Sequence, residues 1–84
     1  MITTEQTNDL LIRALYSAKE TMKDAATVWQ TAEHNLACAK ADRSTSAADL
    51  VRIKAEDEAA YQEYQKAETV YETCYHVCCK LRLI

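Results

Sequence analysis

A seven-residue repeat of apolar and small side chains runs through most of this chain and constrains its fold more than any other feature. These residues recur at alternating spacings of four and three, the pattern of helices packed along a narrow seam. The repeat resumes in the second half after a short polar interruption. With the repeat labelled abcdefg, the a positions are Leu15, Met22, Trp29, Leu36, Leu50, Asp57, Tyr64, Tyr71 and Cys78, and the d positions are Leu11, Ala18, Ala25, Ala32, Ala39, Ile53, Ala60, Ala67, Cys74 and Leu81.

The 84-residue chain contains neither Gly nor Pro, whereas average composition would give about six and about four. Tight turns and bulges in β-sheets usually need these residues, so their absence disfavours strands. A sustained heptad pattern with one polar break predicts a single all-α domain over residues 1–84. The expected fold is two long antiparallel helices forming a helical hairpin, an alanine-rich antiparallel coiled coil.

Local signals predict where the two helices begin and end. Thr3 with Gln6 fits a capping box, and Ser46 followed by Asp49 fits an N-cap with an acidic residue in the first turn. The segment before Ser46 is the most polar one inside the chain. The predicted boundaries are residues 4–42 for the first helix, 43–46 for the turn and 47–82 for the second helix.

One register of this hairpin sets a large residue against a small one in nearly every layer. It pairs Leu11 with Cys78 and Trp29 with Ala60, so the seam is expected to pack closely without voids. The same register brings opposite charges together at the e positions, which favours it over a shifted one. The expected pairs are Glu5 with Arg82, Lys19 with Glu68 and Glu33 with Lys54.

The composition of the chain limits the cellular compartment and the kinds of binding partner that we expect. The first residues contain no basic segment followed by an apolar run, so no signal peptide is expected. No stretch approaches the roughly 20 apolar residues that span a bilayer. We therefore expect a cytoplasmic protein whose four cysteines are thiols. The net charge of −3 disfavours sequence-independent binding to nucleic acid.

No combination of side chains predicts catalysis, a bound metal or a cofactor. Cys74 and Cys78 share the inner seam while His76 points outward, so these groups do not converge as metal ligands. His34 is expected in solvent, without a nucleophile and a carboxylate placed to form a triad. Asp57 is interpreted as a polar seam residue that reaches water past a small residue of the other helix.

Apolar surface beyond the seam is the strongest functional indication. It lies on both flanks of the a and d positions, and a two-helix hairpin cannot bury both, so part of it is expected at an interface. Homodimerisation into a four-helix bundle would cover some of this surface. Acidic residues on the second helix are a further candidate contact, although most such stripes are solvated faces. The predicted interface residues are Tyr16, Tyr61, Val70, Tyr75 and Val77, with Glu58 and Glu63 from the acidic stripe.

These features predict a small non-enzymatic protein-interaction module, such as an inhibitor, adaptor or co-chaperone, that docks on another protein through a helix face. Two alternatives remain open. In shape the chain resembles small helical-hairpin dimers that bind RNA duplexes, but it shares no residue motif with them. The second alternative is a metal or redox protein that uses Cys74, Cys78 and Cys79.

Overall fold

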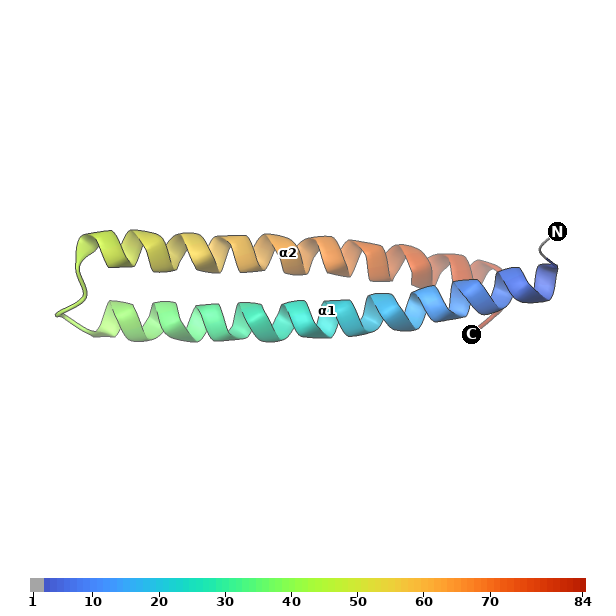
Figure 1. Cartoon of the computed structure of the whole chain (residues 1–84), viewed down its shortest axis with the longest axis horizontal. Helices are drawn as coiled ribbons and strands as arrows, with labels where there is room; N and C mark the ends of the chain where they lie inside the picture. The colour runs from blue at the N-terminus through green and yellow to red at the C-terminus, as the bar shows by residue number, and fades with distance from the viewer. Residues whose placement is uncertain (1–2) are drawn as a thin grey trace.

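The structure is a computed structural model that describes residues 3–84, and these residues form two helices. Helix α1 spans Thr4–Ala41 and helix α2 spans Ala47–Lys80. They lie antiparallel and side by side in a rod 62 Å long (Figure 1). The predicted all-α helical hairpin is confirmed, although the predicted helix ends are one residue too late for α1 and two too late for α2. Within residues 3–84 neither helix is long and apolar enough to cross a membrane.

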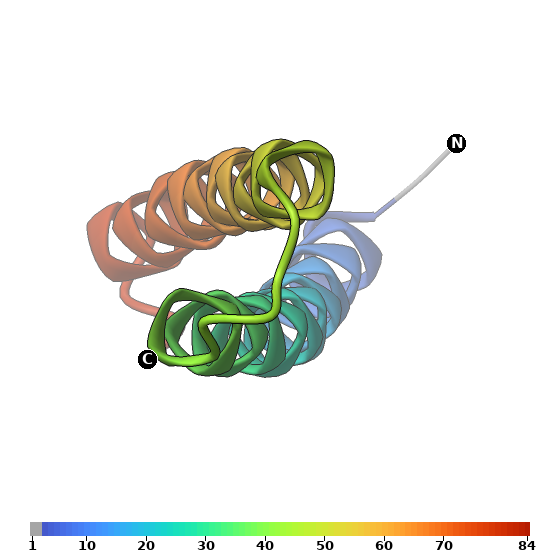
Figure 2. The same ribbon diagram turned by 90° about the vertical axis from the view of Figure 1, so that its left-hand side faces the viewer.

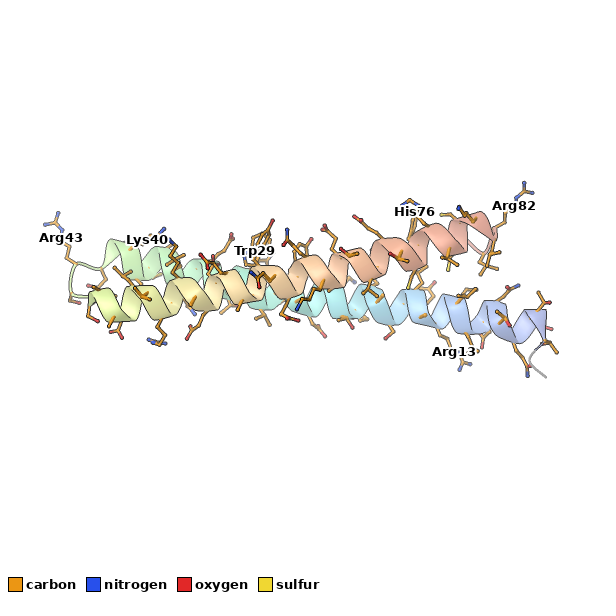
Figure 3. All side chains as sticks on the ribbon, turned by 90° about the horizontal axis from the view of Figure 1, so that it is seen from above. Arg13, Trp29, Lys40, Arg43, His76 and Arg82 are labelled. Carbon is orange, nitrogen blue, oxygen red and sulfur yellow. The ribbon has the colours of Figure 1, made fainter. Side chains whose placement is uncertain are left out.

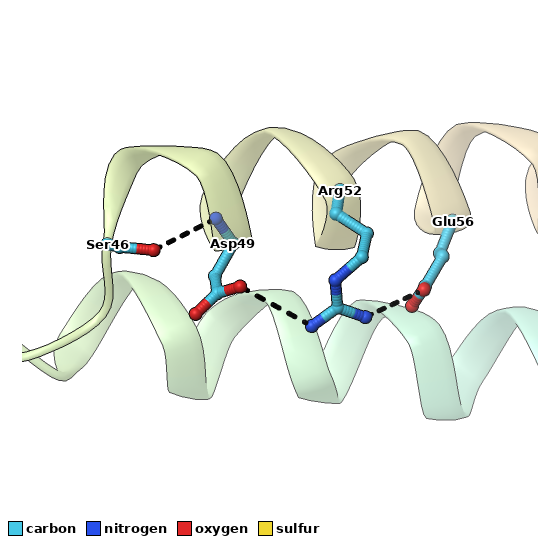
Figure 4. Close-up of polar contacts among 4 residues, drawn as sticks. All are labelled: Ser46, Asp49, Arg52 and Glu56. Carbon is cyan, nitrogen blue, oxygen red and sulfur yellow. Dashed lines mark hydrogen bonds and ion pairs between the residues drawn. The ribbon is translucent and has the colours of Figure 1, made fainter.

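Both helices begin at the caps that the sequence predicts. The Gln6 N–H donates to Thr3 Oγ1 at 3.1 Å, and the Thr3 N–H donates to Gln6 Oε1 at 3.0 Å, which completes a capping box. At the start of α2 the Asp49 N–H donates to Ser46 Oγ at 3.2 Å (Figure 4). The Asp49 carboxylate also lies 3.9 Å from the Arg52 guanidinium. The hydrogen bonds to Thr3, Gln6 and Ser46 satisfy backbone N–H groups that have no partner within the first helical turn.

Helix α2 ends in a hydrogen-bonded turn that the sequence reading missed. The N–H of Arg82 donates to the carbonyl of Cys79 at 3.0 Å, and that of Leu83 donates to the carbonyl of Cys78 at 2.9 Å. This is a Schellman motif, and Arg82 takes the left-handed conformation that Gly usually supplies, with φ of 57°. Because the chain turns here, Leu81 does not join the seam as predicted but is 52% exposed.

The two helices wind around each other with a left-handed twist. Viewed from the turn, α2 shifts to one side and α1 to the other as they recede (Figure 2). Seen from above, the two ribbons cross (Figure 3). A sustained repeat of seven residues produces this hand, because it drifts slowly against the ideal helical period and the helices supercoil to stay in contact.

The core follows the predicted seam but is small. The thiol of Cys78 donates to the backbone carbonyl of Leu11 across the hairpin at 3.7 Å, so these two residues face each other as the register predicts. Most other a and d residues are half-buried. Within residues 3–84 the buried hydrophobic side chains are Leu15, Ala18, Ala39, Ala60, Ala67 and Cys78.

The three predicted ion pairs between the helices are absent from the part of the chain that the structure describes. Every ion pair found there joins residues three or four positions apart in one helix. Glu68, the expected partner of Lys19, instead lies beside the hydroxyl of Tyr64 in its own helix. An exposed pair contributes only a few tenths of a kcal/mol, so packing at the seam decides the register without these pairs.

Candidate protein-docking surfaces

The heptad pattern makes the two long edges of the hairpin different. In a helix, position a lies next to e and position d lies next to g, while in an antiparallel pair e meets e and g meets g. Large residues occupy most a positions and small residues occupy most d positions. Large side chains therefore lie along the e edge, and fewer large side chains cover the g edge.

Five aromatic residues line the e edge, which we call the aromatic edge: Trp29, Tyr61, Tyr64, Tyr71 and Tyr75. The ring centroid of Trp29 lies 4.8 Å from that of Tyr61 and 5.3 Å from that of Tyr64. Tyr71 and Tyr75 are 6.2 Å apart. In Figure 3, Trp29 projects from the side of the pair near the crossing of the ribbons. Tyr61 and Tyr75 are 41% and 44% exposed, so these two rings remain accessible.

Two of these tyrosines have raised pKa values. Hydrogen bonding to Glu68, together with the negative charge of that carboxylate, raises the pKa of Tyr64. Hydrogen bonding to Cys79, together with the charge of its thiolate, raises the pKa of Tyr75. Both phenols therefore stay neutral to higher pH than an ordinary tyrosine, and each keeps a hydroxyl that can donate or accept a hydrogen bond.

The opposite edge is hollow. A groove of about 480 Å³ lies between α1 and α2, and a hollow of about 450 Å³ continues it toward the turn, since Ala25 and Glu63 line both. The seam residues Ala18, Ala60 and Ala67, which line it, are buried, so the groove is an open surface feature beside the seam, where small d residues leave space that the larger a residues do not cover. We call this surface the alanine groove and define it by Ala14, Ala18, Ala25, Ala60, Ala67 and Val70.

The seven predicted interface residues fall on two separate surfaces. Two of them line the alanine groove, and a third lies at the next g position of α2. The remaining four are exposed at e positions or at the neighbouring b positions. One docked partner therefore does not contact all seven. The two groups are Glu63, Val70 and Val77 at the groove, and Tyr16, Glu58, Tyr61 and Tyr75 at the aromatic edge.

The four cysteines are free thiols in different surroundings. Cys78 is buried against α1, whereas Cys38 is exposed and its Sγ lies 3.5 Å from Nε2 of His34. The sequence reading missed this contact, although residues four apart are neighbours on a helix surface. Within residues 3–84, no group of three or more His, Cys, Asp or Glu side chains is placed to hold a metal ion.

Asp57 is the one carboxylate on the inner seam, and it is half-buried. Its Oδ1 is enclosed and has no hydrogen-bond partner, so the expectation that this side chain reaches water fails for that oxygen. An enclosed carboxylate oxygen without a partner destabilises the fold. We therefore expect a small apolar residue in place of Asp57 to make the hairpin more stable.

The fold and these surfaces place the chain among antiparallel helical hairpins. Comparison with protein-family models, with curated proteins and with solved structures finds no match to it.

Proposed function

We propose that this chain is a non-enzymatic protein-interaction module that docks on a partner protein through its aromatic edge, as an inhibitor, adaptor or co-chaperone does. The observation that carries this proposal is the set of exposed tyrosine rings that contact other rings along a long helical scaffold. Tyr61 and Tyr75 keep 41% and 44% of their surface accessible while they pack on Trp29 and Tyr71.

Such rings are suited to the centre of a protein interface. Tyrosine and tryptophan supply most of the binding free energy in many interfaces, because each buries a large area for few rotatable bonds. The contact with Trp29 in the free hairpin already limits the rotation of Tyr61, so little further side-chain entropy is lost on docking.

The charges near the rings indicate the chemistry of the partner. Glu58 and Glu72 are exposed at b positions bordering the aromatic edge, and neither forms an ion pair within residues 3–84. Lys19 and Lys54 are exposed at e positions of the same edge. A matching surface would therefore present apolar pockets for the rings and side chains of both charges around them. Such complementarity would act mainly on association rate and specificity.

The test compares binding by three forms of the full chain. Wild-type protein, the double variant Tyr61→Ala/Tyr75→Ala and the control variant Val70→Ala are immobilised and used to capture a partner from cell extract, and the affinity of the captured protein is then measured. Removing two central rings should weaken binding by a factor of ten or more, since a single such truncation often costs about 2 kcal/mol. Val70→Ala, at the alanine groove, should bind like the wild type.

Circular dichroism should give equal helix content for the three forms, because the replaced side chains are exposed. If the double variant retains wild-type affinity, the aromatic edge is not the docking surface.

A further inference from the structure

We propose that a second copy of this chain covers the alanine groove, so that two hairpins form a four-helix bundle with both aromatic edges outside. This inference concerns the opposite edge from the proposed partner site and does not depend on it. It rests on the lining of the groove, on the small core of one hairpin and on the area that the hairpin leaves exposed.

The lining of the groove permits close approach of another helix. On the α1 side it is formed by small, uncharged residues, among them Ala14, Ser17 and Thr21. On the α2 side Ala67 and Val70 supply the apolar surface. Small side chains bring helix backbones near one another, as the alanine layers within this hairpin do.

The charged residues at the border do not select a partner of opposite charge. Lys66 and Glu63 both line the groove and pair with each other at 3.2 Å, and Glu56 pairs with Arg52 at 3.0 Å. The border is thus neutralised within α2. A second surface of the same composition suits it better than a strongly basic or acidic one.

A single hairpin encloses too little to be a typical stable domain. Six hydrophobic side chains are buried within residues 3–84, and four of them are alanines. All four cysteines are free, so no disulfide within the hairpin compensates for the small core. Chains of this size usually need a staple or an oligomer, and oligomerisation is the means that these residues offer.

The exposed area supports the same conclusion. The hairpin exposes 6496 Å², whereas a compact monomer of 9.5 kDa would expose about 5,000 Å². The excess of roughly 1,500 Å² per chain is larger than the roughly 800 Å² that each partner contributes to a standard interface. Two hairpins packed along their full length would bury about this much exposed surface. A single short segment docked in the groove would bury less.

The experiment is a mass measurement by light scattering on the reduced full chain, from low micromolar to near-millimolar concentration. Wild-type protein should have twice the 9.5 kDa mass of one chain. Val70→Glu places a charge in the groove and should weaken the dimer at least tenfold. The matched control is Val51→Glu, the same change in the same helix at a position 70% exposed and outside the groove lining, which should remain dimeric.

A second pair of variants tests the α1 side and covers the case in which Val70→Glu fails to fold. Thr21→Lys, in the groove lining, should yield monomers with wild-type helix content by circular dichroism. Thr27→Lys, exposed on α1 outside that lining, should leave the dimer intact.

Three results would overturn the proposal: a wild-type monomer throughout the concentration range, dimers that persist in both groove variants, or a partner protein whose helix binds the groove of a monomer. The two proposals fail separately. Loss of the dimer in Val70→Glu with unchanged partner binding supports both, whereas loss of the dimer in Tyr61→Ala/Tyr75→Ala alone would place the self-contact at the aromatic edge.

Discussion

Arg82 adopts a conformation that is unfavourable for any residue with a β-carbon. Its φ of 57° lies in the left-handed region, which costs an L-residue roughly 1–2 kcal/mol. Arg82→Gly removes that penalty but adds some backbone entropy to the unfolded chain, so it should stabilise the hairpin by about 1 kcal/mol. Urea denaturation monitored by circular dichroism measures this gain. Arg82→Ala, which removes the charge but keeps the β-carbon, should not reproduce it.

Asp42 accepts two hydrogen bonds in the turn, from the Ser44 hydroxyl at 2.7 Å and the Ser44 N–H at 2.9 Å. They hold the pKa of Asp42 below 3.8. A carboxylate with a lowered pKa in the folded state stabilises the protein above 3.8, and this contribution disappears as the pH falls through the folded-state pKa. Ser44→Ala should raise the pKa of Asp42 toward 3.8 in an NMR titration. Ser46→Ala, which removes the α2 cap instead, should leave the pKa of Asp42 unchanged.

Asp57 has one enclosed carboxylate oxygen without a hydrogen-bond partner. Asp57→Ala should stabilise the hairpin by about 1–3 kcal/mol more than Asp24→Ala does, because only Asp57 is removed from water. Both replacements increase helix propensity by the same amount, so the difference between them isolates the effect of burial. Equal free energies of unfolding for the two variants would mean that water reaches the Asp57 carboxylate.

At the scale of the helix, most features followed from local sequence. The capping box at Thr3 and the N-cap at Ser46 form as predicted, because each depends on residues only three positions apart. The end of α2 was predicted less well. Without a Gly to mark the stop, nothing in the local pattern indicated that Arg82 would take the left-handed conformation.

Ala39 tests the packing between the helices. It is 8% exposed and does not line the alanine groove, so the larger isobutyl side chain of leucine cannot extend into that groove. Ala39→Leu should therefore destabilise the hairpin by about 1–3 kcal/mol through overpacking. Ala37→Leu, two residues earlier and exposed, is the matched control and should change the free energy of unfolding by less than about 0.5 kcal/mol. Denaturant unfolding of the two variants side by side makes the comparison.

The folded protein should become more stable against thermal unfolding as the protein concentration rises. If the second copy stabilises only the folded chain, mass action raises the thermal midpoint as total protein increases. Calorimetry of wild-type protein over a wide concentration range should record this rise. Val70→Glu should melt at a midpoint that does not change with concentration, and a wild-type midpoint equally independent of concentration would contradict the dimer.

The sequence by itself determined the helices, their antiparallel pairing and which residues form the seam, because these follow from a local period and from capping residues close in the chain. It also marked all seven candidate interface residues as surplus to the seam. The heptad assignment already placed Val70 and Val77 on one flank and the three tyrosines on the other. Only the tertiary structure showed that aromatic rings contact one another along one edge and that the opposite edge is a groove. These features depend on the direction that each a side chain takes, as Trp29 does toward Tyr61 and Tyr64, and this direction is decided by packing against the other helix.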